Sequence, residues 1–181
     1  MAILSRLRFA TILGFALACV IGPAAAQDAT LEYAVKANYL YKFGPFVEWP
    51  ASAFSGPTSP FNVCVAGDDP FGAVLDEATR GQAVQGHPVV VRRMAVVLAG
   101  APCHVLYLGR SRNQTPAEAL KAVRNEPVLT VTDEHQGTSR GMVNFVLKDG
   151  RVRFGLDAEA AQASGLALSS KLLALSVGPP R

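Results

Sequence analysis

Hydrophobic and polar positions follow strand-like and helix-like patterns in turn along most of this chain. Four short apolar runs indicate buried strands: 61–66, 88–92, 103–108 and 128–132. Between them, 70–78 and 116–123 have helical patterns that open on a proline, and Thr115 is placed to cap the second helix. Alternating strands and helices predict an α/β fold, with a mainly parallel sheet flanked by helices.

The C-terminal part has a different pattern. Two apolar runs, 142–147 and 151–156, flank Asp149 and Gly150, a dipeptide typical of tight turns between antiparallel strands. The second run alternates apolar residues with arginines, so we expect an antiparallel hairpin at one edge of the sheet, with one solvated face. Residues 158–175 indicate a helix interrupted near Gly165.

The first 26 residues have the features of a secretory signal peptide. Arg6 and Arg8 precede an apolar run at 9–21, and Ala24-Ala25-Ala26 offers small residues for cleavage before Gln27. A lipoprotein signal, with Cys19 as the modified residue, is the weaker alternative, because the apolar run continues past that cysteine. Removal of 1–26 leaves 27–181 as a single domain, exported to the periplasm.

Length and charge exclude several classes of protein. The leader contains two of the 17 basic residues and none of the 14 acidic ones, so the mature formal charge is +1. A charge so near zero gives no reason to expect nucleic-acid binding. No later segment has the roughly 18 consecutive apolar residues of a membrane helix, so we expect no membrane span after cleavage.

The N-terminal helix, expected at about 29–47, belongs to the most aromatic part of the chain. Seven aromatic residues lie between Tyr33 and Phe54. They form either a thick core layer or a contact with another copy or another protein, since aromatic residues concentrate in interface anchors. The residues predicted for a dimer or partner interface are Tyr39, Phe43, Phe46 and Trp49 here, and Leu166, Leu168 and Leu172 in the C-terminal segment.

Two cysteines remain after cleavage, Cys64 and Cys103, and an exported protein is expected to join them in a disulfide. The bond would close a loop of about 40 residues, which is worth on the order of 4 kcal/mol of stability. A redox-sensing role is the alternative to this structural one.

Three patterns resemble catalytic, nucleotide-binding or metal sites, but each lacks a feature that such a site requires. The string 137–141 matches the Gly-x-Ser-x-Gly nucleophile motif and lies close to His135, but it leads into a strand rather than a helix. The string 67–72 lacks the glycine spacing of nucleotide-binding loops, and the three histidines share no metal-ligand spacing. The sequence therefore predicts no catalytic residue, metal or cofactor.

Several strings together resemble the YfiR-like family of periplasmic regulators. They are Val35-Lys36-Ala37-Asn38-Tyr39-Leu40-Tyr41-Lys42-Phe43, Phe46-Val47-Glu48-Trp49-Pro50, the segments beginning at Cys64, Cys103 and Val128, and the C-terminal Gly141-Met142-Val143-Asn144-Phe145 and Ser169-Ser170-Lys171-Leu172-Leu173. They occur in the family's order and cover about 31–177. Each string is weak alone, but the combination is specific.

The resemblance implies a protein without enzymatic activity that binds the periplasmic domain of an inner-membrane diguanylate cyclase. By restraining that enzyme it would link the state of the periplasm to cyclic-di-GMP signalling and biofilm formation. We expect a homodimer from the aromatic N-terminal segment. The alternative is a periplasmic small-ligand-binding accessory protein of another sensor or transport system, with a cleft at the strand ends near Asp68, Arg110 and Asp133.

Overall fold

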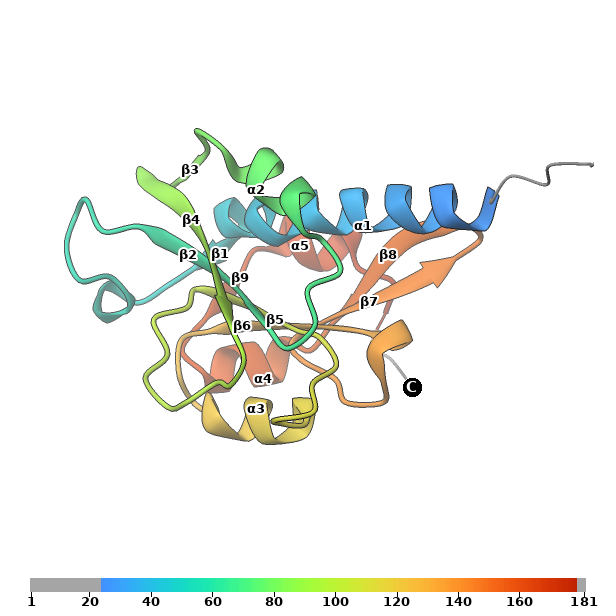
Figure 1. The fold of residues 1–181 in the computed structure, drawn as a ribbon. Coiled ribbons are helices and arrows are strands. Elements are labelled where there is room, and N and C mark those ends of the chain that lie inside the picture. The colour runs from blue at the N-terminus through green and yellow to red at the C-terminus, as the bar shows by residue number, and fades with distance from the viewer. Residues whose placement is uncertain (1–23, 179–181) are drawn as a thin grey trace, which may run out of the picture.

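The computed structural model describes residues 24–178, and a seven-stranded sheet lies at its centre (Figure 1). In spatial order the strands are β3 (Ala83–Val84), β4 (His87–Met94), β2 (Phe61–Ala66), β5 (Val105–Leu108), β6 (Leu129–Asp133), β7 (Val143–Lys148) and β8 (Arg151–Leu156). The five central strands are parallel, whereas β3 and β8 are antiparallel edge strands. The predicted single α/β domain, with a hairpin at one edge, is confirmed.

The burial of each strand agrees with its sequence pattern. All six residues of β2 are buried, as are the whole of β5 and β6, which explains their continuous apolar runs. Strands β7 and β8 meet at a turn in which Asp149 and Gly150 both have positive φ. That conformation is why an Asp-Gly pair signals a hairpin.

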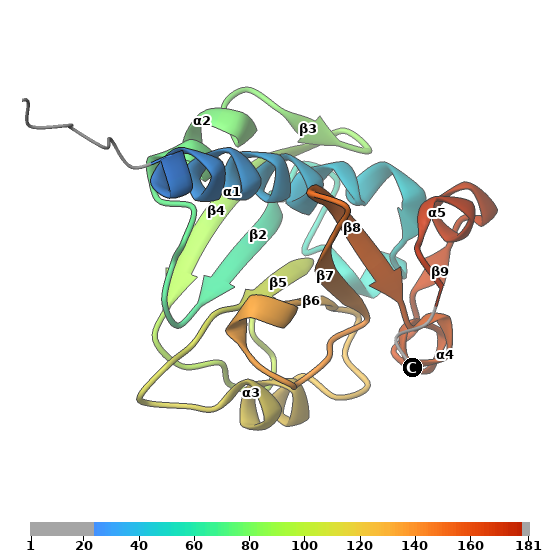
Figure 2. The same cartoon turned by 90° about the vertical axis from the view of Figure 1, so that its right-hand side faces the viewer.

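Helices lie on both faces of the sheet. Helix α1 (Ala24–Lys42) crosses one face, with α2 (Ala73–Thr79) beside it, and α3 (Pro116–Ala122) lies on the other (Figure 2). Thr115 caps α3 as predicted, by accepting a hydrogen bond from the Glu118 backbone. Helices α4 (Ala158–Ala163) and α5 (Ser170–Leu175) follow β8 at the end of the sheet. None of the helices within 24–178 combines the length and the hydropathy needed to cross a membrane.

The N-terminal helix ends earlier than predicted, at Lys42 instead of near Val47. Gly44 and Pro45 follow, and proline disfavours helical geometry in the residue before it. The backbone also passes close to β3 here, because a Cβ on Gly44 would lie 2.5 Å from Val84 Cγ1. The chain then forms two short 3-10 helices, η1 (Gly44–Phe46) and η2 (Ala51–Ala53), with strand β1 (Val47–Glu48) between them.

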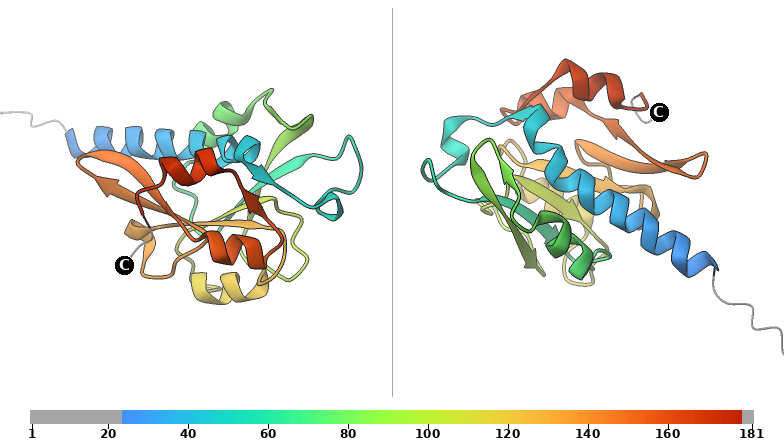
Figure 3. Two further views of the ribbon diagram at one scale, coloured as in Figure 1. Left: turned by 180° about the vertical axis from the view of Figure 1, so that it is seen from behind. Right: turned by 90° about the horizontal axis from the view of Figure 1, so that it is seen from above.

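The C-terminal segment contains a strand that the sequence did not predict. Gly165, with φ of +77°, ends the helical stretch, and β9 (Ala167–Leu168) separates α4 from α5. Strands β9 and β1 form a second, two-stranded antiparallel sheet, in which Leu168 is opposite Val47. This small sheet joins the N-terminal segment to the C-terminal one (Figure 3).

The connection from β6 to β7 contains no α-helix. A parallel connection normally contains one, but here residues 134–142 include only the 3-10 helix η3 (Glu134–Gln136) and an extended stretch. The connection therefore fills little space beside α3.

The predicted leader lies mostly outside the described residues, which begin at Ala24, and Cys19 lies wholly outside them. The residues Ala24 to Ala26, which the predicted cleavage would remove, are the first of α1.

Candidate functional site

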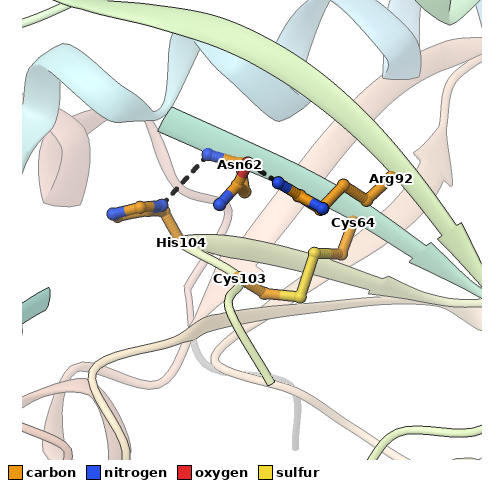
Figure 4. Close-up of a disulfide and its surroundings, with 5 residues drawn as sticks. All are labelled: Asn62, Cys64, Arg92, Cys103 and His104. Atoms are coloured by element: carbon orange, nitrogen blue, oxygen red, sulfur yellow. Dashed lines mark hydrogen bonds between the residues drawn. A yellow bond between two sulfur atoms is a disulfide. The ribbon is translucent and has the colours of Figure 1, made fainter. Parts of the chain in front are cut away.

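The predicted disulfide between Cys64 and Cys103 is confirmed (Figure 4). The Cα atoms lie 5.8 Å apart, because β2 and β5 are neighbours in the sheet and Cys103 immediately precedes β5. Cys64 is fully buried, and Cys103 lines a cavity of about 410 Å³ at the amino ends of the strands.

Next to the disulfide, a hydrogen-bonded chain joins the buried His104 and Asn62 to the exposed Arg92 (Figure 4). The backbone N–H of Asn62 donates to Nδ1 of His104 at 3.0 Å, and Nε of Arg92 donates to the side-chain oxygen of Asn62 at 2.9 Å. Burial lowers the pKa of His104 to about 4. The imidazole is therefore neutral at ordinary pH and acts as a hydrogen-bond acceptor for the β2 backbone.

His104 is also one member of a column of four stacked rings. Successive ring centroids lie 4.0 Å apart from His87 to Phe54, 4.5 Å from Phe54 to His104 and 4.9 Å from His104 to Phe61. Trp49 packs edge-on against Phe61 at 5.1 Å. The column holds the loop that contains Phe54 against the sheet beside the disulfide.

At the carboxyl ends of the strands, a second cluster is charged. Lys36 of α1 pairs with Asp133, which ends β6, and both side chains are fully buried. Lys36 also pairs with Glu32, which in turn lies 3.3 Å from Nδ1 of His135. Burial, together with the charge of Asp133, raises the pKa of the neighbouring Tyr107 phenol, which stays neutral. These contacts fix α1 to η3 and to the end of the sheet.

The structure brings two of the three predicted cleft residues together. Asp68 and Arg110 line a cavity of about 630 Å³, whereas Asp133 does not line it and is paired with Lys36. The cavity lies beside β2 and β5, where the order of the strands in the sheet reverses direction. Open parallel sheets commonly bind ligands at such a point.

Directly between the ends of β2 and β5, however, the two backbone segments are in close contact. The N–H of Asp68 donates to the carbonyl of Arg110 at 2.7 Å, and a Cβ on Gly109 would lie 2.1 Å from the Asp68 carbonyl. The guanidinium of Arg110 donates to the carbonyl of His135 at 2.7 Å. Ligand binding at this cleft stays a prediction.

The predicted interface residues differ in burial. Phe43, Trp49, Leu166 and Leu172 are all buried within the single chain and belong to its main core. Tyr39, Phe46 and Leu168 are half-buried and pack against that core. The rings of Tyr39 and Phe43 both contact Phe154 of β8, at 5.6 and 5.2 Å. The aromatic residues of α1 thus form a thick core layer, and their part in an interface stays a prediction.

Other apolar side chains are exposed. Leu173 and Leu175 of α5 are 40% and 58% exposed, and they lie near Leu168 in the chain. On α1, Leu31 is 66% exposed, and with Val35 and Leu147 it lines a groove of about 510 Å³ between this helix and the β7–β8 hairpin. Sequence reasoning missed these positions because it gave most weight to aromatic residues.

The other sites considered from sequence gain no support. The string 137–141 lies in the connection from β6 to β7 and leads into a strand, as its pattern indicates. In the part of the chain that the structure describes, no three His, Cys, Asp or Glu side chains are grouped so as to hold a metal ion.

The amino-acid sequence matches one known family. The YfiR/HmsC-like family matches residues 33–177, which cover β1 to β9 and all but the first turns of α1. No curated protein shows a significant match to the chain. The family is known as one of periplasmic regulators rather than enzymes. The match spans most of the sequence, and the chain therefore belongs to the YfiR/HmsC-like family.

Proposed function

We propose that this protein is a periplasmic regulator without enzymatic activity that binds the periplasmic domain of an inner-membrane diguanylate cyclase and represses it. Membership of the YfiR/HmsC-like family supports the regulatory role, and the cyclase as target comes from the resemblance described above. The observation that carries the proposal is a partly exposed apolar strip, which we define as the half-buried Phe46 and Leu168 together with the exposed Leu173 and Leu175.

The apolar strip is built on a rigid base. Leu168 belongs to the small sheet in which β9 pairs with β1, and the N–H of Ser169 donates to the carbonyl of Phe46 at 2.9 Å. Beneath it, Leu166 and Leu172 are each only 2% exposed and fix β9 and α5 to the core. A surface that is already ordered loses little entropy on binding, which favours affinity.

Repression then needs no chemistry from this protein. A regulator shifts its partner's equilibrium by the difference between its affinities for the active and inactive states. A few apolar side chains that become buried in only one of those states are enough, since hot-spot residues supply most of the energy of an interface. We place Leu168 and Leu173 in this role.

The test compares two charged substitutions with a matched control. Leu168→Glu and Leu173→Glu should raise cyclic-di-GMP in cells as deletion of the gene does, and should abolish binding of the purified protein to the cyclase's periplasmic domain. Leu98→Glu is the control, because Leu98 is 70% exposed and belongs to the loop between β4 and β5. Unchanged thermal unfolding of each variant shows that the fold is intact.

Two results would contradict the proposal. In the first, deletion leaves cyclic-di-GMP unchanged. In the second, Leu168→Glu and Leu173→Glu repress the cyclase as well as the wild type and the Leu98→Glu control do, which would show that the apolar strip is not part of the interface.

We also propose that the protein is a homodimer. The groove between α1 and the β7–β8 hairpin supports a surface for this contact, because it is lined by Leu31 and Val35 of α1, whose side chains are 66% and 38% exposed. This surface is separate from the apolar strip, so one copy could bind a second copy and a cyclase at once.

The alternative function is small-ligand binding for another sensor or transport system. The cavity beside Asp68 and Arg110 favours it, because it lies at the strand ends where open parallel sheets bind ligands. An unchanged cyclic-di-GMP level on deletion, together with tight binding of a periplasmic metabolite, would establish this alternative.

A further inference from the structure

We propose that the groove between α3 and α4 binds a small organic anion, with a carboxylate or phosphate head and an apolar body. This groove has a volume of about 690 Å³, within the range of small-molecule sites. It is distinct from the apolar strip and from the cavity beside Asp68 and Arg110, and the proposal does not depend on the cyclase being the partner.

The groove exists because of the unusual connection from β6 to β7. In most parallel sheets a helix would lie between α3 and α4 at this point. Here no α-helix fills that place, and the stretch that includes Ser139, Arg140 and Gly141 lines an open groove together with residues of both helices.

The floor of the groove is firmly fixed. The N–H of Met142 donates to Oγ1 of Thr130 at 3.0 Å, and the N–H of Asp157 donates to the carbonyl of Met142 at 2.8 Å. A Cβ on Gly141 would lie 2.8 Å from the carbonyl of Thr130, so the extended stretch lies directly against β6. A ligand would therefore meet a surface that is already formed, which reduces the entropy lost on binding.

Three cationic side chains line this groove: Lys121 on α3, Arg124 just after it, and Arg140 on the extended stretch. Among the described residues, none of the three forms an ion pair or a side-chain hydrogen bond. Arg93 shows the contrast, because Asp69 and Asp76 both pair with it.

Little negative charge offsets these cations. Asp157 is the only acidic residue among those that line the groove, and one of its oxygens already accepts the N–H of Ala160 at the start of α4. Three free cations against one engaged carboxylate favour an anionic ligand, and arginine suits the planar geometry of carboxylate and phosphate.

Ser164 gives independent support. It lines the groove at the end of α4 and is only 7% exposed, yet no residue in the described part of the chain hydrogen-bonds to its hydroxyl. The hydroxyl remains accessible and keeps its donor available, so an oxygen of a ligand in the groove can accept its hydrogen bond.

The walls of the groove account for the apolar body of the ligand. Leu120 and Ala117 come from α3, Ala160 and Ala163 from α4, and Met142 from the floor. Small alanines on both helices leave room for a flat ring or a short alkyl chain between them. The groove thus combines apolar walls with a few convergent polar groups, which is typical of small-molecule sites.

The test uses phenyl phosphate as the probe and benzyl alcohol as its uncharged counterpart, in a nuclear magnetic resonance titration of the mature protein. Phenyl phosphate should shift the amide signals of 117–125, 139–142 and 160–164, whereas benzyl alcohol should bind at least tenfold more weakly. The triple variant Lys121→Gln, Arg124→Gln, Arg140→Gln should lose at least tenfold in affinity for phenyl phosphate.

The matched control removes three exposed cations that lie outside the grooves and cavities described above: Lys42→Gln, Arg80→Gln, Lys148→Gln. It changes the net charge equally but leaves the groove intact, so its affinity should equal that of the wild type. Ser164→Ala should weaken phenyl phosphate binding severalfold with no change of charge. An equal loss in both triple variants would mean that only overall charge matters, and would overturn the proposal.

The same anionic chemistry is present in lipid headgroups, so a second arm uses vesicles of phosphatidylglycerol. Sedimentation with these vesicles that is lost in the groove variant but kept in the control would identify a membrane lipid as the source of the anion. Binding of phenyl phosphate without sedimentation would identify a free metabolite. If neither probe binds at millimolar concentration, the proposal fails, whatever the effect of the protein on cyclic-di-GMP.

Discussion

Lys36 on α1 and Asp133 at the end of β6 form an ion pair between two fully buried side chains, although 97 positions separate them in the sequence. Asp133 also accepts the N–H of His135, and Lys36 also pairs with Glu32. The pair therefore fixes the N-terminal helix to both the sheet and η3. Removing one partner would leave the other charge buried without compensation, which is costly.

The first prediction concerns this pair. Lys36→Met should lower the free energy of unfolding by about 3–5 kcal/mol, measured by urea denaturation, because Asp133 would lose its buried partner. The double variant Lys36→Met, Asp133→Asn should be less damaged than the sum of its single variants, since no fully buried charge is left unpaired and Glu32, which also loses Lys36, is partly exposed. Additive losses would show that the two side chains are energetically independent.

Several elements could be predicted because their signals are local. Strands β2 and β8 have the predicted bounds. The continuous apolar run of β2 indicates a strand that is buried on both faces, and the alternating run of β8 indicates a strand with one solvated face. The Asp149 and Gly150 turn and the Thr115 cap depend on the conformation of a few adjacent residues. The disulfide followed from the count of cysteines left after the leader.

Other features depend on residues that are distant in sequence. Strands β1 and β9 are two residues long, and each exists only because it pairs with the other. The ring column joins Phe54, His87 and His104 from three separate segments. A lysine at position 36, between Val35 and Ala37 in an otherwise apolar stretch, was a signal of a buried charge, but its partner could not be deduced without the topology.

The second prediction concerns the disulfide. Protein isolated from the periplasm should have no free thiol, and its intact mass should equal that of a chain that begins at Gln27. Cys64→Ser, Cys103→Ser should lower the free energy of unfolding by about 4 kcal/mol, because the bond restricts a loop of 39 positions in the unfolded chain. Two free thiols in the isolated protein would refute the bond, and an unchanged melting temperature after reduction would show that it is not structural.

The third prediction is a pH dependence of stability. The pKa of His104 is about 4 in the folded protein, against 6.5 when the side chain is exposed, so the unfolded chain binds more protons between these values. The contribution of His104 to stability is complete above pH 6.5 and is lost as the pH falls toward 4. The loss is at most about 3 kcal/mol, and solvent screening reduces it.

The variant His104→Asn tests this pH dependence, because an amide oxygen can still accept the Asn62 N–H but does not titrate. The difference in unfolding free energy between wild type and variant should shrink as the pH falls from 7 to 4. The carboxylates contribute equally to both proteins and cancel in this difference. A difference that stays constant across this range would exclude His104 as the titrating group.

The last prediction concerns self-association. Leu31→Glu, Val35→Glu should convert a dimer into a folded monomer in light scattering, because two charges would enter the apolar groove between α1 and the β7–β8 hairpin. Val90→Glu, Leu98→Glu is the matched control, since both positions are exposed and lie on other elements. Substitution of Phe43 would not test the interface, because this ring is 1% exposed and its loss would unfold the core. A dimer that survives the α1 changes would place the contact elsewhere, and a wild-type monomer would remove the homodimer from the proposal.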